Sequence, residues 1–339
     1  MGIDRGGRRP TIRDVAAVAG VSRGTVSRVL NGGSLVSPAA RRMVEEAIRS
    51  TGYTANHHAR SLATGKAGSL AFLLTERQHL LFDDPTFAQL LRGTAAALTD
   101  RRMTLVLLVA GTEAERASVL DYVSAGHVDG VMLVSTHESD PLVDSLVSAE
   151  VPVVCCGLPL GHEDEIPSIS VDEAGSARMM VGHLRRRGHR RIAMIAGPED
   201  TPGGKYRLSG FADAMGEEFD SALVARGDYS TDSGAAAMRG LLSAVGVQGI
   251  DAVFAASDRM AAGAVAALHE SGLEVPGDVA VAGFDDAGLA ATHAPPLTTM
   301  RQPWEEISGC MVEAALNAAA GGTPERLTLS AELVVRDST

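Results

Sequence analysis

A short stretch of polar residues near the start of the chain could read the bases of DNA. These residues form the polar side of a predicted helix. They are Ser22, Arg23, Gly24, Thr25, Ser27 and Arg28. Arg23 and Arg28 are long and cationic, and their guanidinium forks can hydrogen-bond to guanine. Gly24 has no side chain and contributes little direct readout. The alternative is that these residues form only the solvated face of a surface helix.

Capping signals place two helices around this stretch. Thr11 can cap the first helix, with Asp14 as its reciprocal partner, and Gly20 can adopt the positive φ that ends it. Ser22 then caps a second helix that runs to about Asn31 and turns its apolar residues inward. The outward side of this second helix is the polar stretch described above.

A third helix completes the predicted head. Ser37 followed by Pro38 is an N-cap with proline at the first helical position, and this helix ends near Gly52. Two short helices joined by a three-residue turn, with a further packing helix, are the minimal motif for reading the major groove. The sequence therefore predicts an all-α helix-turn-helix head.

The charge distribution favours contact between this head and a polyanion. Residues 1–66 contain 11 Arg or Lys and 4 Asp or Glu, a net charge of +7. The rest of the chain contains 19 and 38, a net charge of −19. An acidic body discourages non-specific binding of nucleic acid through the wrong face. Arg5, Arg8 and Arg9 form a basic arm that either contacts phosphates or is a tail without a role.

From Ser69 onward short apolar runs alternate with amphipathic segments. The predicted strands are 70–74, 105–109, 131–134, 151–156, 192–196, 252–255 and 279–282. The predicted helices are 87–99, 113–125, 174–187, 210–215, 233–244 and 259–270. Strands that are apolar on both faces are typical of parallel sheets between helix layers. The body is therefore predicted to be α/β, with two doubly wound lobes and a ligand cleft at the carboxyl ends of the strands.

Residues 11–63 resemble the DNA-binding head of the lactose-repressor (LacI/GalR) family. The matching segments are Ile12-Arg-Asp-Val-Ala, Ala19-Gly-Val-Ser, Thr25-Val-Ser-Arg-Val-Leu-Asn31 and Val36-Ser-Pro, with Arg41, Gly52-Tyr53 and Asn56. The resemblance implies DNA contacts by Thr11, Ser22, Arg23, Gly24, Thr25, Ser27, Arg28, Asn31, Tyr53, Asn56, His57, Arg60 and Leu62. It also implies a head at 1–54 and a hinge helix at 55–66.

In that family a hinge leucine, here Leu62, wedges into the minor groove of the operator, a known way to kink DNA. The hinge departs from the family pattern at Ala55, where proline is usual, and at His57, where arginine is usual. His57 and His58 either make DNA affinity depend on pH or are plain exposed hinge residues.

The resemblance extends through the body, in segments such as Val128-Asp-Gly-Val, Arg207-Leu-Ser-Gly-Phe211, Ser257-Asp-Arg-Met-Ala and Gly283-Phe-Asp-Asp286. It implies a two-lobed fold similar to periplasmic sugar-binding proteins, over residues 67–339. The chain then crosses between lobes three times. The N-lobe is expected at 67–166 and 298–326, and the C-lobe at 167–297 and 327–339.

Effector contacts carried over from the family are Phe87, Arg207, Tyr229, Ser257 and Asp285. Asp285 is expected to accept hydrogen bonds from ligand hydroxyls, and Arg207 is a fixed multi-donor fork. The alternative for these two is a salt bridge within one lobe, and for Phe87 and Tyr229 it is core packing. Ser257 replaces the usual asparagine. Gly157 stands where some sugar binders carry an aspartate, so a lactose-like specificity is doubtful.

Other functional classes find little support. Gly20-Val-Ser-Arg-Gly24 matches a hydrolase nucleophile elbow, but Ser22 follows a helix rather than a strand. Gly203-Gly-Lys205 lacks the other residues of a P-loop. Cys155, Cys156 and Cys310 have no C-x-x-C spacing, and a metal site at His183 and His189 is disfavoured. No enzyme, cofactor or catalytic residue is therefore expected. No segment has the length of a membrane span or the core of a signal peptide.

These observations predict a cytoplasmic, nucleoid-associated homodimer that represses a catabolic operon. A two-fold dimer implies a palindromic operator with half-sites about one helical turn apart. A small-molecule effector, expected to be a sugar, would bind in the cleft and change the orientation of the lobes. The alternatives are a corepressor-dependent repressor and a regulator that responds to purines or nucleosides.

Overall fold

The computed structural model describes residues 10–30, 36–53 and 66–339, which belong to two compact units. The first unit ends at Gly68, and the second runs from Ser69 to Thr339. Several predicted positions lie outside the described residues, namely Arg5, Arg8, Arg9, Asn31, Ala55, Asn56, His57, His58, Arg60 and Leu62.

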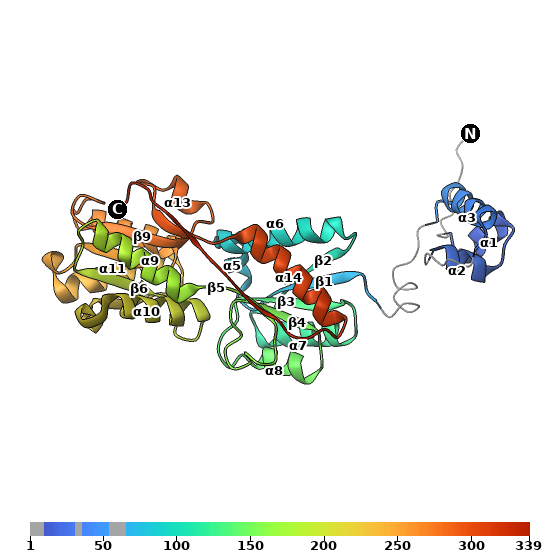
Figure 1. Ribbon diagram of the computed structural model, residues 1–339, viewed down its shortest axis with the longest axis horizontal. Helices are drawn as coiled ribbons and strands as arrows, with labels where there is room; N and C mark the ends of the chain where they lie inside the picture. Colours follow the sequence, from blue (N-terminus) through green and yellow to red (C-terminus); the bar gives the residue numbers. More distant parts are fainter. Residues whose placement is uncertain (1–9, 31–35, 54–65) are drawn as a thin grey trace. The chain divides into compact units, whose positions relative to one another are not determined.

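The first unit is the predicted three-helix head, drawn in blue in Figure 1. Its helices are α1 (Ile12–Ala19), α2 (Arg23–Leu30) and α3 (Pro38–Thr51). The predicted cap of α1 is confirmed, because the backbone N–H and the hydroxyl of Thr11 each donate to Asp14 Oδ2 at 2.7 Å. Gly20 ends α1 with a φ of 63°. The small core consists of Val15, Ala16, Ala19, Val26, Val29, Val44 and Ala47.

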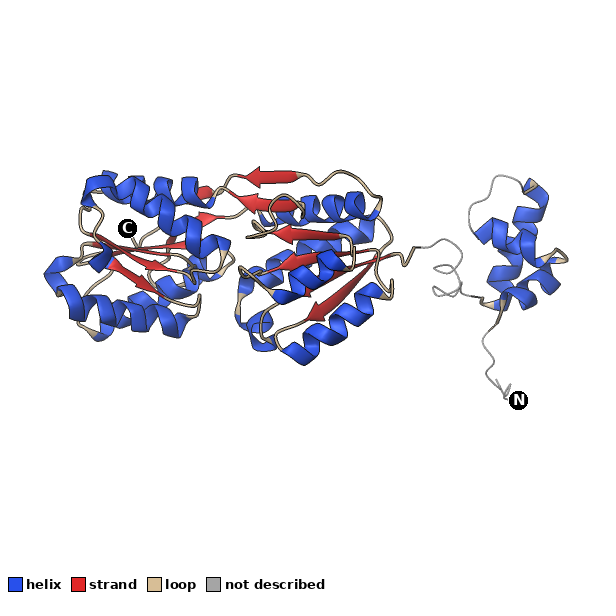
Figure 2. Ribbon diagram, turned by 90° about the horizontal axis from the view of Figure 1, so that it is seen from below, coloured by secondary structure: helices blue, strands red, loops and turns tan. Residues whose placement is uncertain are grey.

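The second unit contains two six-stranded sheets, each between layers of helices, as Figure 2 shows. The first sheet has the order β11-β5-β4-β3-β1-β2, and its neighbouring strands are all parallel. Its strands are β1 (Ser69–Leu74), β2 (Thr104–Val109), β3 (Gly130–Val134), β4 (Val153–Cys156), β5 (Ser168–Val171) and β11 (Arg326–Leu329). Its helices are α5 (Gln78–Asp83), α6 (Pro85–Asp100), α7 (Glu113–Ser124), α8 (Pro141–Ser148) and α14 (Trp304–Ala319). We call this half the first lobe.

The other half, the second lobe, has the sheet order β12-β10-β9-β8-β6-β7, with only β12 antiparallel to its neighbour. Its strands are β6 (Ile192–Ala196), β7 (Val224–Arg226), β8 (Ala252–Ala255), β9 (Ala280–Asp285), β10 (Thr298–Arg301) and β12 (Glu332–Val334). Its helices are α9 (Glu173–Arg186), α10 (Pro202–Met215), α11 (Thr231–Val245), α12 (Asp258–Glu270) and α13 (Leu289–Thr292), with short 3-10 turns at Gly216–Glu218, Ser221–Leu223 and Val247–Gly249. The predicted α/β class with parallel sheets is confirmed.

The apolar runs form strands because both faces of each sheet are covered. Leu70, Phe72 and Leu74 of β1 pack in the core shared with α6 and α14. Ala71 and Leu73 point the other way, into a core with α7 and α8. Successive side chains of a strand alternate between faces, so a strand covered on both sides must be apolar throughout.

The chain crosses between lobes three times, but each crossing comes after the position that the sequence predicts. β5 belongs to the first sheet although residue 167 onward was assigned to the C-lobe. Likewise β10 belongs to the second sheet and β11 to the first, against predicted boundaries at 298 and 327. In each case the chain forms one more strand in the sheet of the first of the two lobes, and only then crosses to the other lobe. The crossings therefore lie at 171–173, 301–304 and 329–332.

Several elements were absent from the prediction, including β5, β7, β10, β11, β12, α8 and α14. The missed strands are three or four residues long, and several mix polar with apolar residues, as in Thr298–Arg301. Across the ranges that the structure describes, no helix combines the length and apolar character needed to span a bilayer. The same ranges contain no cluster of three metal-binding side chains.

Candidate DNA interface and effector cavity

The polar side of α2 is open to solvent in the head. Ser22, Arg23, Gly24 and Arg28 are exposed, while the neighbouring Val26 and Val29 are buried. The Ser22 hydroxyl accepts from the backbone N–H of Thr25 at 3.1 Å, which fixes the start of the helix. Arg28 Nε donates to the carbonyl oxygen of Gly24 at 3.1 Å, so its guanidinium lies along the exposed face. The helix thus presents two cations and small side chains outward, the arrangement that major-groove reading requires.

Other predicted contacts in the head have structural tasks of their own. The Thr11 hydroxyl donates to Asp14 Oδ2 within the cap of α1. Tyr53 is half-buried and packs against the head core just beyond α3, and Ser27 and Thr25 are also half-buried. Their contact with DNA stays a prediction.

In the body, a cavity between the lobes brings together all five predicted effector residues. Phe87 comes from α6 in the first lobe, whereas Arg207, Tyr229, Ser257 and Asp285 come from the second. Arg207 lies in α10, and Tyr229, Ser257 and Asp285 lie at or just after the carboxyl ends of strands. This is where ligands bind in open parallel sheets. Their role as effector contacts stays a prediction.

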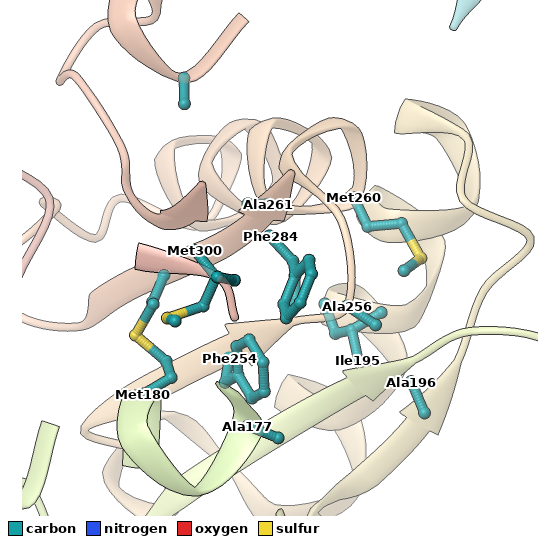
Figure 3. Packing of buried hydrophobic residues seen from close by; sticks show 14 of the residues in the cluster. Ala177, Met180, Ile195, Ala196, Phe254, Ala256, Met260, Ala261, Phe284 and Met300 are labelled. Carbon is teal, nitrogen blue, oxygen red and sulfur yellow. The ribbon is translucent and has the colours of Figure 1, made fainter. Parts of the chain in front are cut away.

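Arg207 is the centre of the polar side of this cavity. Its Nε and Nη2 donate to the two carboxylate oxygens of Glu173 at 2.6 and 3.2 Å, and its Nη1 donates to the carbonyl of Ala256 at 2.5 Å. The guanidinium carbon lies 3.6 Å from the centre of the Phe284 ring. Figure 3 shows that ring in the apolar core of the second lobe, near Phe254. Arg207 is 6% exposed, so partners on several sides hold it in one orientation.

Asp285 faces Arg207 across 3.7 Å and is held in a strained backbone conformation. Its φ is +111°, a region that non-glycine residues rarely adopt. Its Oδ1 accepts from Gln302 Nε2 at 2.8 Å, and its carbonyl accepts from Trp304 Nε1 at 3.2 Å. Burial raises the pKa of the Asp285 carboxyl, Arg207 opposes this, and Asp258 and Asp84 add to it. Arg207 and Asp285 thus contact each other within one lobe and also line the cavity, whereas their contact with an effector stays a prediction.

Tyr229 packs closely against two glycines, Gly197 and Gly203. Its hydroxyl and that of Thr201 are 2.9 Å apart, and burial raises the pKa of Tyr229 to about 12, so it stays protonated. A Cβ at Gly197 would lie 2.4 Å from the ring carbon Cζ, and one at Gly203 would lie 3.0 Å from the hydroxyl oxygen. Only glycine at Gly197 therefore allows this ring to occupy the wall of the cavity.

The remaining walls are mostly apolar and come from the first lobe. Phe87, Leu90, Val134 and Ile307 contribute this surface. Ser257 belongs to the second lobe, and its hydroxyl caps α12 by accepting from the Met260 N–H at 3.2 Å. The cavity thus combines a fixed polar end with an apolar cover, the usual composition of a small-molecule site.

Some cavity residues were missed in the sequence. Glu173 has the sequence pattern of an ordinary acidic residue in the first turn of a helix. Trp304 is the only tryptophan of the chain, and this rarity could have drawn attention to it. Gly157, which also lines the cavity, has a φ of +89°, where an aspartate would be strained.

Both units of the chain are similar to parts of known bacterial regulatory proteins. Residues 11–56 match the model "Bacterial regulatory proteins, lacI family", and residues 181–339 match a periplasmic binding protein-like domain. The chain is 43% identical over 337 residues to the HTH-type transcriptional regulator CelR of Thermobifida fusca, covering 98% of each chain. A solved CelR–cellobiose complex matches with a TM-score of 0.78 at 41% identity, covering 98% of this chain and all of the other. A lac repressor dimer bound to operator and the anti-inducer ONPF matches with a TM-score of 0.83 at 28% identity, covering 98% and 99%.

A groove-reading helix joined to a two-lobed ligand-binding body defines a DNA-binding transcriptional regulator. The chain belongs to the LacI family of bacterial regulatory proteins. The resemblance inferred from the sequence is therefore confirmed.

Proposed function

We propose that the protein is an operator-binding repressor controlled by a neutral carbohydrate, cellobiose or a related disaccharide, in the interlobe cavity. The carrying observation is the charge of the cavity lining. Arg207 is the only cationic side chain among the lining residues, and it is committed to Glu173, Ala256 and Asp285. Asp84, Glu173 and Asp285 supply three carboxylates. Such a lining accepts hydrogen bonds from hydroxyl groups and offers no uncommitted cation to a phosphate or another anion.

The aromatic residues of the cavity fit the same ligand class. Trp304, Phe87 and Tyr229 all line it. Apolar aromatic surface combined with a few fixed polar groups is suited to a sugar ring, which has apolar faces and polar edges. The similarity to CelR, for which a complex with cellobiose has been solved, supports the choice of disaccharide.

On this proposal the protein acts as a cytoplasmic homodimer at a palindromic operator, by binding rather than catalysis. The second helix of each head reads a half-site. Leu62 of each hinge wedges into the minor groove. Effector binding changes the relation of the lobes and lowers DNA affinity, because the effector prefers one of two states.

Calorimetric titration tests the ligand class directly. We expect cellobiose to bind and glucose 6-phosphate not to bind, because Arg207, the only cationic side chain of the lining, is already paired with Glu173 and Asp285. Adenosine serves as a neutral nucleoside control. Binding of adenosine or of the phosphate in preference to cellobiose would refute the carbohydrate proposal.

A substitution tests the proposed role of the hinge. Leu62→Ala should weaken operator binding, and an unchanged affinity for the operator would exclude the insertion of this leucine into the minor groove.

A further inference from the structure

His137 joins the two lobes through its two ring nitrogens. It follows β3 in the first lobe, directly after the cavity residues Ser135 and Thr136. Its Nδ1 is 2.8 Å from Asp200 Oδ2, in the loop between β6 and α10 of the second lobe. Its Nε2 is 2.8 Å from Glu76 Oε1, in the loop after β1 of the first lobe. One imidazole therefore connects a carboxylate of each lobe.

Neighbouring groups hold these three side chains in place. Ser135 Oγ donates to the same Glu76 oxygen at 2.9 Å. The backbone N–H of Glu138 donates to the carbonyl of Asp200 at 2.7 Å, a second contact between the lobes. Lys205 Nζ lies 3.5 Å from Glu138 Oε2. The contact between the loops is thus built from main-chain and side-chain bonds.

The other charged groups near His137 have partners of their own. Asp140 and His162 share a small cavity with His137. Asp140 pairs with Arg116 at 3.1 Å, and His162 bridges Asp144 and Glu165 at 2.9 Å each. His162 thus repeats the carboxylate–imidazole–carboxylate arrangement, but entirely within the first lobe.

We propose that Glu76, His137 and Asp200 form an interlobe clasp that holds the lobes together over the effector while His137 is protonated. Both ring nitrogens contact carboxylates, and only the imidazolium form has an N–H on each nitrogen. Loss of one proton leaves one carboxylate facing a ring lone pair, so one of the two bonds fails. The effect on effector retention rests on the proposed function, whereas the clasp itself does not.

The pH range of the clasp follows from its charges. The hydrogen bond to Glu76 is the largest cause that raises the pKa of His137 to about 9, against a burial effect that lowers it. Because this value is above the ordinary 6.5, the contribution of the clasp is complete below pH 6.5 and is lost as the pH rises through about 9. Burial opposes ionisation of Glu76, but hydrogen bonds from His137 and Ser135 lower its pKa overall. Glu76 therefore stays ionised across the neutral range.

Trp304 provides a readout that needs no ligand. It is the only tryptophan of the chain and lines the cavity, so its emission reports on the relation of the lobes. We would follow this emission from pH 6.5 to 10 in wild type, His137→Gln, Asp200→Ala and the matched control His162→Gln. A transition near pH 9 is expected in wild type and in His162→Gln, but not in the other two. The same transition in His137→Gln, or none in wild type, overturns the clasp.

Cellobiose titrations at pH 7 and pH 9.5 test the consequence for retention. Wild type and His162→Gln should bind about three- to tenfold more weakly at pH 9.5, the range for a partly exposed charge-assisted bond. His137→Gln should bind weakly at both pH values. Absence of cellobiose binding by wild type at pH 7 would refute the proposed function, while the ligand-free emission would still decide the clasp. A pH effect on affinity that His137→Gln retains would exclude the clasp as its cause.

Discussion

The exposed face of α2 and the polar end of the cavity use the same residue type in opposite ways. Arg28 is exposed to solvent and donates a hydrogen bond to a carbonyl of its own helix. Arg207 is 6% exposed and contacts a carboxylate, a carbonyl and an aromatic ring. An exposed cation keeps its hydration, so its free-energy cost in the folded protein is small, and it can contact a partner such as DNA. A buried cation must be compensated within the fold, because desolvation of an unpaired charge is costly.

Because of this difference in burial, substitutions in the two regions should affect stability and binding differently. Substitutions on the exposed face of α2 should alter DNA recognition and leave folding unchanged. Substitutions in the cavity should alter effector binding and stability together, since the binding groups there also hold one another in place.

The strongest expected effect comes from Arg207→Ala. It leaves Glu173 and Asp285 without their cation, and removal of one partner of a buried ion pair typically costs about 3–5 kcal/mol. Denaturant unfolding should show this loss, and calorimetry should show no cellobiose binding. A variant as stable as wild type would mean that the guanidinium is not an essential partner of these carboxylates.

Gly197→Ala tests the cavity wall without removing a charge. The added Cβ would lie 2.4 Å from the Tyr229 ring, so the ring must move into the cavity. Overpacking of this kind costs about 1–3 kcal/mol, and cellobiose affinity should fall with it. Gly240→Ala is a matched control, because nothing lies within 4 Å of the Cβ at that helical position. Equal affinity in both variants would show that Tyr229 does not shape the binding surface.

On the exposed side, Arg28→Ala should weaken specific operator binding by about 1–3 kcal/mol and relax the base preference at one position. Its free energy of unfolding should stay within about 0.5 kcal/mol of wild type, as for most surface substitutions. Competition binding with mutated operators measures the first effect. An unchanged site preference would show that Arg28 does not recognise bases. A large loss of stability would show that Arg28, like Arg207, is needed for the fold.

The smallest effect is expected from Trp304→Phe. This change keeps an aromatic ring but removes the hydrogen bond from Nε1 to the Asp285 carbonyl, 3.2 Å long. A single such bond contributes about 0.5–1.5 kcal/mol. Cellobiose affinity should therefore fall only slightly. A complete loss of binding would mean that the indole contacts the effector in a way that phenylalanine cannot replace.

The long buried strands could be predicted from the sequence because both their faces are covered. Residues 70–74 and 192–196 are apolar throughout, and they form β1 and β6. Short strands next to the crossings could not be found in this way. Thr298 and Thr299 of β10 are buried but polar, and their hydroxyls are paired with side chains that lie far away in the sequence. Their pairing depends on tertiary contacts that no local pattern contains.

The cavity was predicted through residues that family resemblance assigns rather than through physical patterns. Arg207 and Asp285 are 78 positions apart in the sequence, and only the fold brings them within 3.7 Å. The clasp histidine, His137, carried no signal at all. Its partners Glu76 and Asp200 lie in loops of different lobes, so their proximity becomes visible only in three dimensions.

Selection of bound sequences from a random duplex pool at physiological salt, with and without cellobiose, tests the central claim most directly. The account predicts an enriched palindrome without the sugar, and a clear fall in its recovery when cellobiose is present. Enrichment that cellobiose does not change would contradict control by a carbohydrate in the cavity. Absence of any enriched palindrome under both conditions would contradict the assignment of the α2 face as a reader of operator DNA.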